Sequence, residues 1–206
     1  LSNIDFFFII KSWPFISIVL VGLLINLIGL FELGAVFGTS TLPRTWRMLE
    51  AGSSFTLAIN ICTFLYSGIL IHRSRISNIN QLIDTTASPN WVLLSSKFLA
   101  IVKMQLVLLS LILITGIIFQ IANGFYDFQI GLYVYELLVL NLIYFVIWAL
   151  LSFLVQTLIS NPYVGLFVMI VLFIGIPLTS LAGIEQTLFK YSQGPGFSYS
   201  DMNGYG

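Results

Sequence analysis

Residues 92–122 read VLLSSKFLAIVKMQLVLLSLILITGIIFQIA, a run in which only Lys97 and Lys103 carry charge. A helix needs about 20 predominantly apolar residues to cross the hydrocarbon core of a bilayer, so this run is longer than a single crossing requires. We expect the extra length to be accommodated by tilt or by helix that continues beyond the hydrocarbon. The run therefore predicts a membrane-spanning helix.

The rest of the chain has the composition of a membrane protein. Hydrophobic residues make up 58% of the 206 residues and charged residues 8%, whereas a soluble domain has about 45–50% and about 25%. Five apolar spans can be drawn, over residues 14–37, 52–71, 92–122, 130–159 and 163–184. We therefore predict an all-α fold, a polytopic transmembrane helix bundle that forms one domain over residues 1–206.

Capping residues and prolines mark several helix boundaries. Pro14 opens the first span, Ser88-Pro89 precedes the third and Asn161-Pro162 precedes the fifth. A Ser or Asn cap followed by Pro is favourable at a helix start, because the cap satisfies one free amide and Pro omits another. Inside the fifth span, Gly175 and Pro177 predict a kink or break, because Pro lacks the backbone donor that a helix interior uses.

The distribution of basic residues predicts the orientation. Basic residues near span ends favour the cytosolic side of a membrane. With a cytosolic N-terminus, five of the eight lie inside (Lys11, Arg73, Arg75, Lys97 and Lys103) and three outside (Arg44, Arg47 and Lys190). We expect a multi-pass protein of the inner (plasma) membrane, with an extracytoplasmic tail over residues 185–206.

A polar stretch, residues 73–91, separates the second and third spans and has a helical pattern. Its apolar residues Ile76, Ile79, Leu82 and Ile83 recur at helical spacing, while Asn78, Asn80, Gln81 and Asp84 fill the other face. Such spacing is typical of an amphipathic helix. We predict a short helix at the cytosolic membrane surface and regard this loop as a functional element.

Known catalytic and cofactor motifs are missing from the sequence. The chain has one histidine, His72, and one cysteine, Cys62, which excludes a histidine-rich metal site and an intrachain disulfide. Gly194-Pro-Gly196 lacks the lysine of a phosphate-binding loop. The scattered basic residues do not form a nucleic-acid footprint. We expect a non-catalytic protein with no cofactor, no metal and no nucleic-acid partner.

Polar residues within the spans are candidates for a substrate path. Ionisable side chains inside a membrane are costly and normally face protein or water, and amides hydrogen-bond between helices. The candidates for lining such a path are Gln105, Glu136, Asn141 and Tyr144. Glu136 and Tyr144 share one stripe of the fourth span with Tyr133 and Trp148. The alternative role of these residues is helix packing, with tyrosines in an aromatic belt at the membrane interface.

Short motifs in a fixed order carry a family resemblance. They are RSRISNINQLID at 73–84, TTASPNW at 85–91, KFLA at 97–100, GFYDF at 124–128, LY at 132–133, NPYVG at 161–165 and YSDMNGYG at 199–206. In this order, the chain resembles the permease subunits of type-two ABC exporters, in a bacterial subgroup often fused to a downstream aminopeptidase-like zinc metallopeptidase. The resemblance covers most of the chain from Arg73 onward and is weaker before Gly52.

The resemblance implies a role for the polar loop. The loop helix would be the coupling helix that docks on a separate ABC ATPase subunit, through Arg73, Arg75, Ile79, Leu82, Ile83 and Asp84. Further partners would be a second permease half or homodimer partner and the lipid bilayer. The family pattern has six spans, so a sixth is expected beyond residue 206 in the parent chain. Neither zinc nor peptidase activity is assigned to these residues.

Other functions stay open from the sequence. A secondary transporter should show inverted repeats and interrupted helices in matching positions, and one interrupted span is predicted here. A membrane-embedded enzyme would need a catalytic constellation, which is absent from the sequence. The chain could instead be a membrane anchor for an attached extracytoplasmic peptidase domain. We expect the permease component of an ATP-driven exporter.

Overall fold

The computed structural model describes residues 2–33, 35–36, 39–40, 42–76, 90–178, 191–192, 199–200 and 204–205. The helices are α1 (Ser2–Ile10), α2 (Trp13–Leu33), α3 (Thr45–Gly52), a 3₁₀ turn η1 (Ser53–Phe55), α4 (Thr56–Ile76), α6 (Asn90–Ala122), α7 (Ile130–Tyr133), the π-helix η2 (Val134–Asn141), α8 (Leu142–Leu158) and α9 (Pro162–Leu178). Two antiparallel two-residue pairs join β1 (Ala35–Val36) to β2 (Thr39–Ser40) and β3 (Tyr199–Ser200) to β4 (Gly204–Tyr205).

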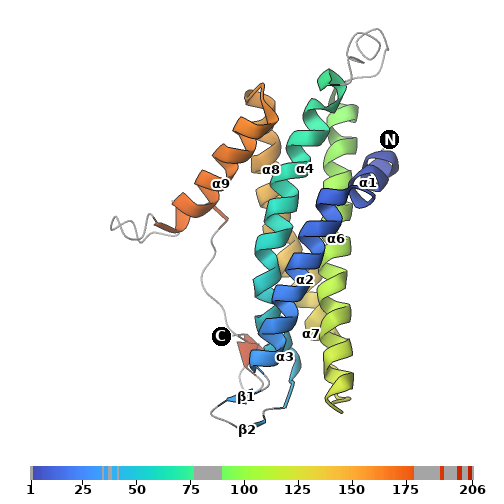
Figure 1. Ribbon diagram of the computed structural model, residues 1–206, viewed down its shortest axis with the longest axis vertical. Coiled ribbons are helices and arrows are strands. Elements are labelled where there is room, and N and C mark those ends of the chain that lie inside the picture. Colours follow the sequence, from blue (N-terminus) through green and yellow to red (C-terminus); the bar gives the residue numbers. More distant parts are fainter. Residues whose placement is uncertain are drawn as a thin grey trace.

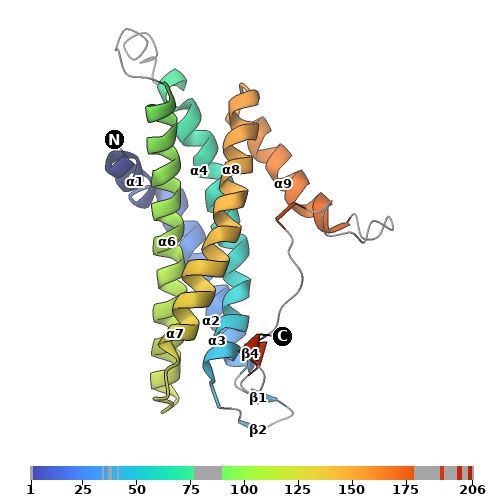
Figure 2. The ribbon, with the colours of Figure 1, turned by 180° about the vertical axis from the view of Figure 1, so that it is seen from behind.

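The long helices form a bundle along one axis. Figures 1 and 2 show α2, α4, α6 and α8 running along the length of the molecule, with α1 lying across the bundle beside α6. Helix α4 contacts α2, α6, α8 and α9 and is therefore the central helix. Helix α9 begins next to the end of α8 and diverges from the bundle axis (Figure 1). The predicted all-α helical bundle is confirmed.

Within the described residues, four helical stretches are long and apolar enough to cross a membrane: Trp13–Glu32, Thr45–Arg73, Trp91–Ala122 and Ile130–Leu158. They coincide with the first four predicted spans, although two boundaries differ. The first helix ends at Leu33, before residue 37. The second starts earlier than residue 52, because α3 and η1 continue without a break into α4.

The fifth predicted span corresponds to α9, an apolar helix of 17 residues. It starts at Pro162, as the Asn161-Pro162 pair predicts, and Asn161 Oδ1 accepts a hydrogen bond from the Tyr163 amide at 2.9 Å. Helix α9 continues through Gly175 and Pro177 to Leu178. Residues 179–184 of the span lie outside the described residues, so a break at or beyond its end stays a prediction.

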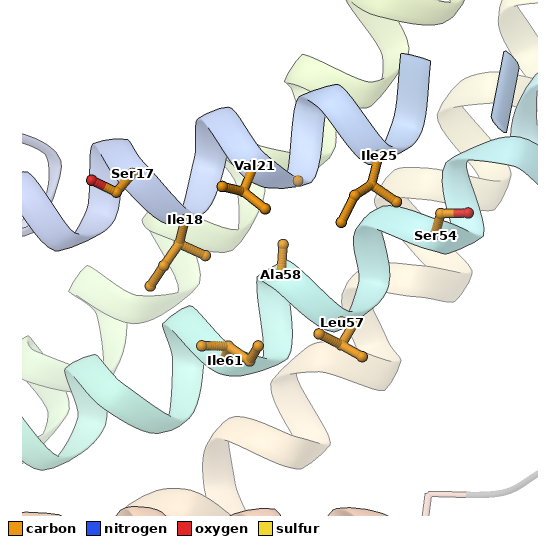
Figure 3. A pocket seen from close by; sticks show the side chains of 9 residues that line it. Ser17, Ile18, Val21, Ile25, Ser54, Leu57, Ala58 and Ile61 are labelled. Atoms are coloured by element: carbon orange, nitrogen blue, oxygen red, sulfur yellow. The ribbon is translucent and has the colours of Figure 1, made fainter. Parts of the chain in front are cut away.

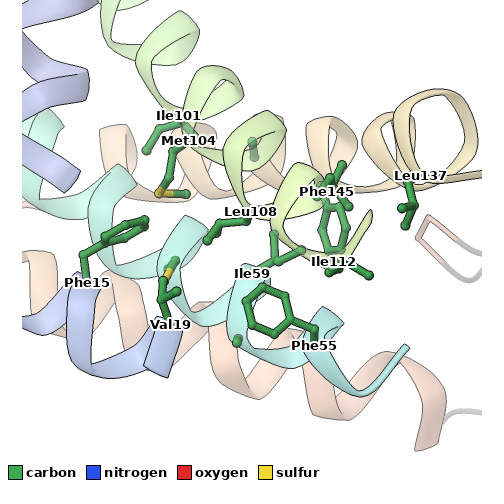
Figure 4. Packing of buried hydrophobic residues seen from close by; sticks show 14 of the residues in the cluster. Phe15, Val19, Phe55, Ile59, Ile101, Met104, Leu108, Ile112, Leu137 and Phe145 are labelled. Carbon is green, nitrogen blue, oxygen red and sulfur yellow. The ribbon is translucent and has the colours of Figure 1, made fainter. Parts of the chain in front are cut away.

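The core lies where α2, α4, α6 and α8 meet. Figure 4 shows side chains from these helices, from η1 and from the π-helix interdigitating; those labelled are Phe15, Val19, Phe55, Ile59, Ile101, Met104, Leu108, Ile112, Leu137 and Phe145. A second cluster, Phe64, Trp148, Val155 and Met169, joins α9 to α4 and α8. The outward faces of the helices are apolar as well, which is the pattern of a helix bundle surrounded by lipid.

Helices α2 and α4 touch at a glycine. A Cβ atom added at Gly22 would lie 2.7 Å from Phe55 Cε2 and 2.8 Å from Ala58 Cβ. The ring of Phe55 is fully buried, and Ala58 Cβ cannot move without its backbone. Small residues at helix contacts in membranes permit such close packing. Gly22 therefore sets the separation of α2 and α4.

We expect Gly22→Ala to lower the free energy of unfolding by about 1–2 kcal/mol, because overpacking forces helices apart. The matched control is Gly29→Ala on the same helix, where the added Cβ would meet Ser54 Oγ at an ordinary 3.7 Å. The control should be neutral or slightly stabilising, since Ala is the better helix former. Denaturation in detergent measures both, and equal effects of the two variants would contradict the close-contact explanation.

Candidate functional site

A polar cavity of about 140 Å³ lies between η1, α6 and the π-helix. Its polar lining consists of Glu50, Ser53, Thr56, Glu136 and Asn141, and its apolar walls of Leu49, Gly52, Leu109, Ile112, Leu137 and Phe145. This volume is several times the roughly 10–15 Å³ that one water molecule requires. Among the described residues, the lining contains two carboxylates and no lysine, arginine or histidine. The cavity can therefore hold water or a small polar group.

The π-helix brings Glu136 and Asn141 to the same cavity. In a regular α-helix of 3.6 residues per turn, residues five apart point about 140° away from each other. A π-helix closes its hydrogen bonds between residues five apart, so these two side chains can face the same side. Stretches of π-helix are rare and occur frequently at functional sites. The sequence predicted both residues as candidates but did not predict this geometry.

Helix α3 and η1 supply the facing wall of the cavity. Thr45, Met48, Leu49 and Gly52 are buried, which leaves Glu50 on the edge of the helix. A Cβ atom added at Gly52 would lie 2.9 Å from Ile112 Cγ2, so α3 packs tightly on α6. Glu50, Ser53 and Thr56 were not predicted from the sequence: residues 45–51 were not assigned to a helix, and Ser53 and Thr56 were not singled out within the predicted span 52–71. Their spacing of three residues is the signal that could have grouped them.

A buried hydrogen-bond network joins the helices at the α3 end of the bundle, next to the cavity. The amide of Gln120 on α6 donates to the Pro43 carbonyl at 2.9 Å, and its oxygen accepts from the Tyr133 hydroxyl at 3.0 Å. The Tyr133 ring is packed so closely that a Cβ at Gly116 would lie 2.8 Å from its hydroxyl oxygen. These contacts tie the start of α3, α6 and α7 together. They fix the position from which the π-helix begins.

Gln105 and Tyr144, the other two candidates for a substrate path, lie beside the cavity but do not line it. Gln105 is fully buried and donates to Thr63 Oγ1 and to the Phe145 carbonyl, both at 3.1 Å. The Tyr144 ring packs edge-on against Phe145, at 5.2 Å between centroids. Phe145 itself lines the cavity. Glu136 and Asn141 are thus brought together by the fold, and Gln105 and Tyr144 support the helix that carries them.

Farther along α4 from the cavity, small polar groups join α4 to α8 and α9. The hydroxyls of Ser67 and Ser152 hydrogen-bond to each other. Gln156 is fully buried, and Cβ atoms added at Gly68 and Gly165 would lie 2.8 Å and 2.3 Å from its amide group. The Gln156 side chain is therefore held between two glycines of neighbouring helices.

The predicted ATPase-coupling residues are only partly described. Arg73, near the end of α4, forms an ion pair with Asp5 of α1 at 3.0 Å and lies over the ring of Phe8 at 4.3 Å. Arg75 lies within α4, but its side chain is outside the described part. Ile79, Leu82, Ile83 and Asp84 fall outside the described residues altogether. Their predicted amphipathic helix stays a prediction.

A larger groove, of about 400 Å³, lies between α2 and α4 and is apolar (Figure 3). Its lining residues include Val21, Ile25 and Leu57, which are 57%, 49% and 58% exposed. The two polar side chains in its lining are Ser17 and Ser54. Apolar and open on the outer face of the bundle, this groove belongs to the surface that would meet lipid. The smaller cavity is the better candidate site, because its lining is partly polar and includes two carboxylates.

The described helices form a polytopic bundle with the lengths and composition of membrane spans, and an acidic cavity lies between η1, α6 and the π-helix. Within the described residues, no group of three or more His, Cys, Asp or Glu side chains could hold a metal ion. Comparisons with family models, with curated proteins and with solved structures find no match to this chain.

Proposed function

We propose that this chain is the transmembrane permease component of an ATP-driven ABC exporter and couples to a separate ATPase subunit. The sequence resemblance supplies the class of transporter. The observation that carries the proposal is the polar cavity of Glu50, Ser53, Thr56, Glu136 and Asn141, which opens between helices long and apolar enough to span a membrane. Ionisable groups in spans normally face protein or water, so a cavity lined by carboxylates supports a water-accessible path rather than a simple anchor.

The two ends of the bundle differ in charge, which supports a cytosolic position for the loop over residues 77–89. The described side chains around α1 include four cations, Lys11, Arg73, Lys97 and Lys103, and one carboxylate, Asp5. Around α3, four carboxylates (Glu32, Glu50, Asp127 and Glu136) accompany two cations (Arg44 and Arg47). By the positive-inside rule, the α1 end would face the cytosol, where an ATPase subunit can reach the loop.

The two helices next to the loop both reach the cavity. Helix α4 starts at Thr56 in the cavity wall and ends at Ile76, a length of 21 residues. At 1.5 Å per residue, this connects the cavity to the loop over about 30 Å. Helix α6 starts at Asn90 and contributes Leu109 and Ile112 to the same wall. Displacement of the loop by ATP-driven closure of the ATPase subunit would move the two cavity walls that α4 and α6 form, as in other rigid-body transitions.

Association with an ATPase subunit tests the proposal. The full-length protein, expressed with its genomic neighbours and purified, should retain an ATP-binding-cassette subunit. We expect Leu82→Asp with Ile83→Asp to abolish this association, because the two carboxylates would replace the apolar anchor at the centre of the interface.

The matched control is Asn78→Asp with Asn80→Asp, which adds the same charge to the predicted polar face of the same loop. The control should keep the ATPase subunit bound. Association that survives the Leu82 and Ile83 changes would contradict the coupling role of these residues. Failure of any ATPase subunit to copurify with the wild-type chain would contradict the exporter proposal itself.

A further inference from the structure

Three cations surround the first turns of α1. Lys103 on α6 donates to Asn3 Oδ1 at 2.6 Å, and Arg73 on α4 pairs with Asp5 at 3.0 Å. Lys97, nearly two turns before Lys103 on α6, lies within electrostatic range of both Asp5 and Arg73. The cations lie on α4 and α6, and their partners Asn3 and Asp5 lie on α1, so three helices meet at this point. We call Lys97, Lys103 and Arg73 the basic corner.

The charge of the basic corner is incompletely compensated within the described part of the protein. Asp5 is engaged by Arg73, and its side chain is 16% exposed. The Lys103 ammonium contacts a neutral amide oxygen. The corner therefore has three positive charges and one negative charge, and exposed Lys11 follows at the end of α1. A ligand that complements this corner has to be an anion.

The outer face of α1 is apolar and exposed. Ile4, Phe7 and Phe8 are 64%, 57% and 39% exposed and lie three to four residues apart, on one side of the helix. Ile9 on the opposite side is fully buried. Because α1 lies across the bundle (Figure 2), its exposed stripe crosses the direction of the long helices and does not run parallel to them. This is the geometry of a helix that lies in a membrane interface.

We propose that the basic corner binds the headgroup of an anionic phospholipid whose acyl chains lie against Ile4, Phe7 and Phe8. A headgroup phosphate meets Lys97 and Lys103, while the adjacent apolar stripe accepts hydrocarbon. Basic pockets between membrane helices bind anionic headgroups in this manner. A soluble anion would use the cations but not the stripe, so the pairing of the two selects a lipid.

The bound lipid would act on the end of α4. Arg73 lies three residues before the last described residue of α4 and also contacts Phe8 of the lipid-facing stripe. A headgroup in the corner would therefore hold α1 against both helices that lead into the loop over residues 77–89. This inference depends on the basic corner and the membrane, and it does not require an ATPase partner.

Titration of the purified full chain in neutral detergent tests the proposal. Phosphatidylglycerol should bind more tightly than phosphatidylcholine with the same acyl chains, as followed by native mass spectrometry. Lys97→Gln with Lys103→Gln should weaken phosphatidylglycerol binding at least about tenfold, because each cation near an anionic surface contributes about fivefold in affinity. Lys97→Arg with Lys103→Arg, which keeps the charge, should retain the preference.

The matched control is Arg44→Gln with Arg47→Gln, two cations at the other end of the bundle, and phosphatidylglycerol binding should be unchanged in this variant. Equal binding of the two lipids by the wild-type chain would overturn the proposal. An equal loss of binding in the control pair would also overturn it, since net charge would then account for the effect. Competition by millimolar inorganic phosphate as strong as that by the lipid would show a site for a free anion instead.

Discussion

Gly165→Ala is expected to detach α9 from the bundle and to lower the free energy of unfolding by about 3 kcal/mol, the upper end for overpacking. The added Cβ would lie 2.3 Å, 2.6 Å and 2.7 Å from Oε1, Cδ and Nε2 of Gln156. The amide cannot retreat, because Gly68 of α4 contacts it from the other side. Thermal unfolding in detergent measures the loss, and Gly175→Ala on the same helix is the control, since no described atom would lie within 4 Å of its added Cβ.

A double-mutant cycle isolates the cause. Gln156→Ala removes the colliding atoms, so Gly165→Ala should cost little in that background. The coupling energy between the two positions should lie at the upper end of the 0.5–3 kcal/mol range found for residues in contact. If Gly165→Ala costs as much with Gln156→Ala as without it, the glycine is required for some other reason and the three-helix contact explained here is wrong.

Hydropathy predicted the spanning helices, because the run of about 20 apolar residues that a bilayer crossing requires lies within one continuous stretch of sequence. Residues 92–122 were expected to span, and α6 covers Asn90–Ala122. The same holds for the fourth span, 130–159, where helix runs from Ile130 to Leu158. Proline also acts locally, and α9 begins at Pro162 as the sequence indicates.

Features that depend on contacts between distant residues were not predictable in this way. The π-helix of Val134–Asn141 changes the direction of its side chains without any change in hydropathy. Helix α1 is too short to span, and its position depends on the contact between Asp5 and Arg73, which are 68 residues apart. The exact composition of the cavity depends on how α3 and the π-helix pack on α6.

Of the four residues that the sequence predicted for the candidate site, two line the cavity. Glu136 and Asn141 stood out because polar groups in a span are unusual, and both line the cavity. Gln105 and Tyr144 stood out for the same reason but serve packing next to Phe145. Polarity alone cannot separate these roles, because a buried amide can equally face a helix or a cavity. Glu50 was missed because its helix was not recognised.

The proposed exporter function requires the cavity to change its exposure when the proposed ATPase subunit closes. A cysteine at Asn141 would report this, in a background where buried Cys62 is replaced by alanine. The control is Ile143→Cys, two residues along on the outer face of the next helix, where the side chain is 55% exposed on the apolar surface. Its reactivity toward a water-soluble reagent should not depend on nucleotide.

The most direct measurement is therefore the rate at which a membrane-impermeant maleimide, added from the extracytoplasmic side, labels Asn141→Cys in the complex reconstituted with its ATPase subunit. Trapping the ATPase with ATP and vanadate should raise this rate about tenfold or more, since an unfavoured conformation is populated at only about 0.1–10%. Leu82→Asp with Ile83→Asp should remove the increase. Equal labelling with and without ATP would contradict the coupling of the loop to the cavity.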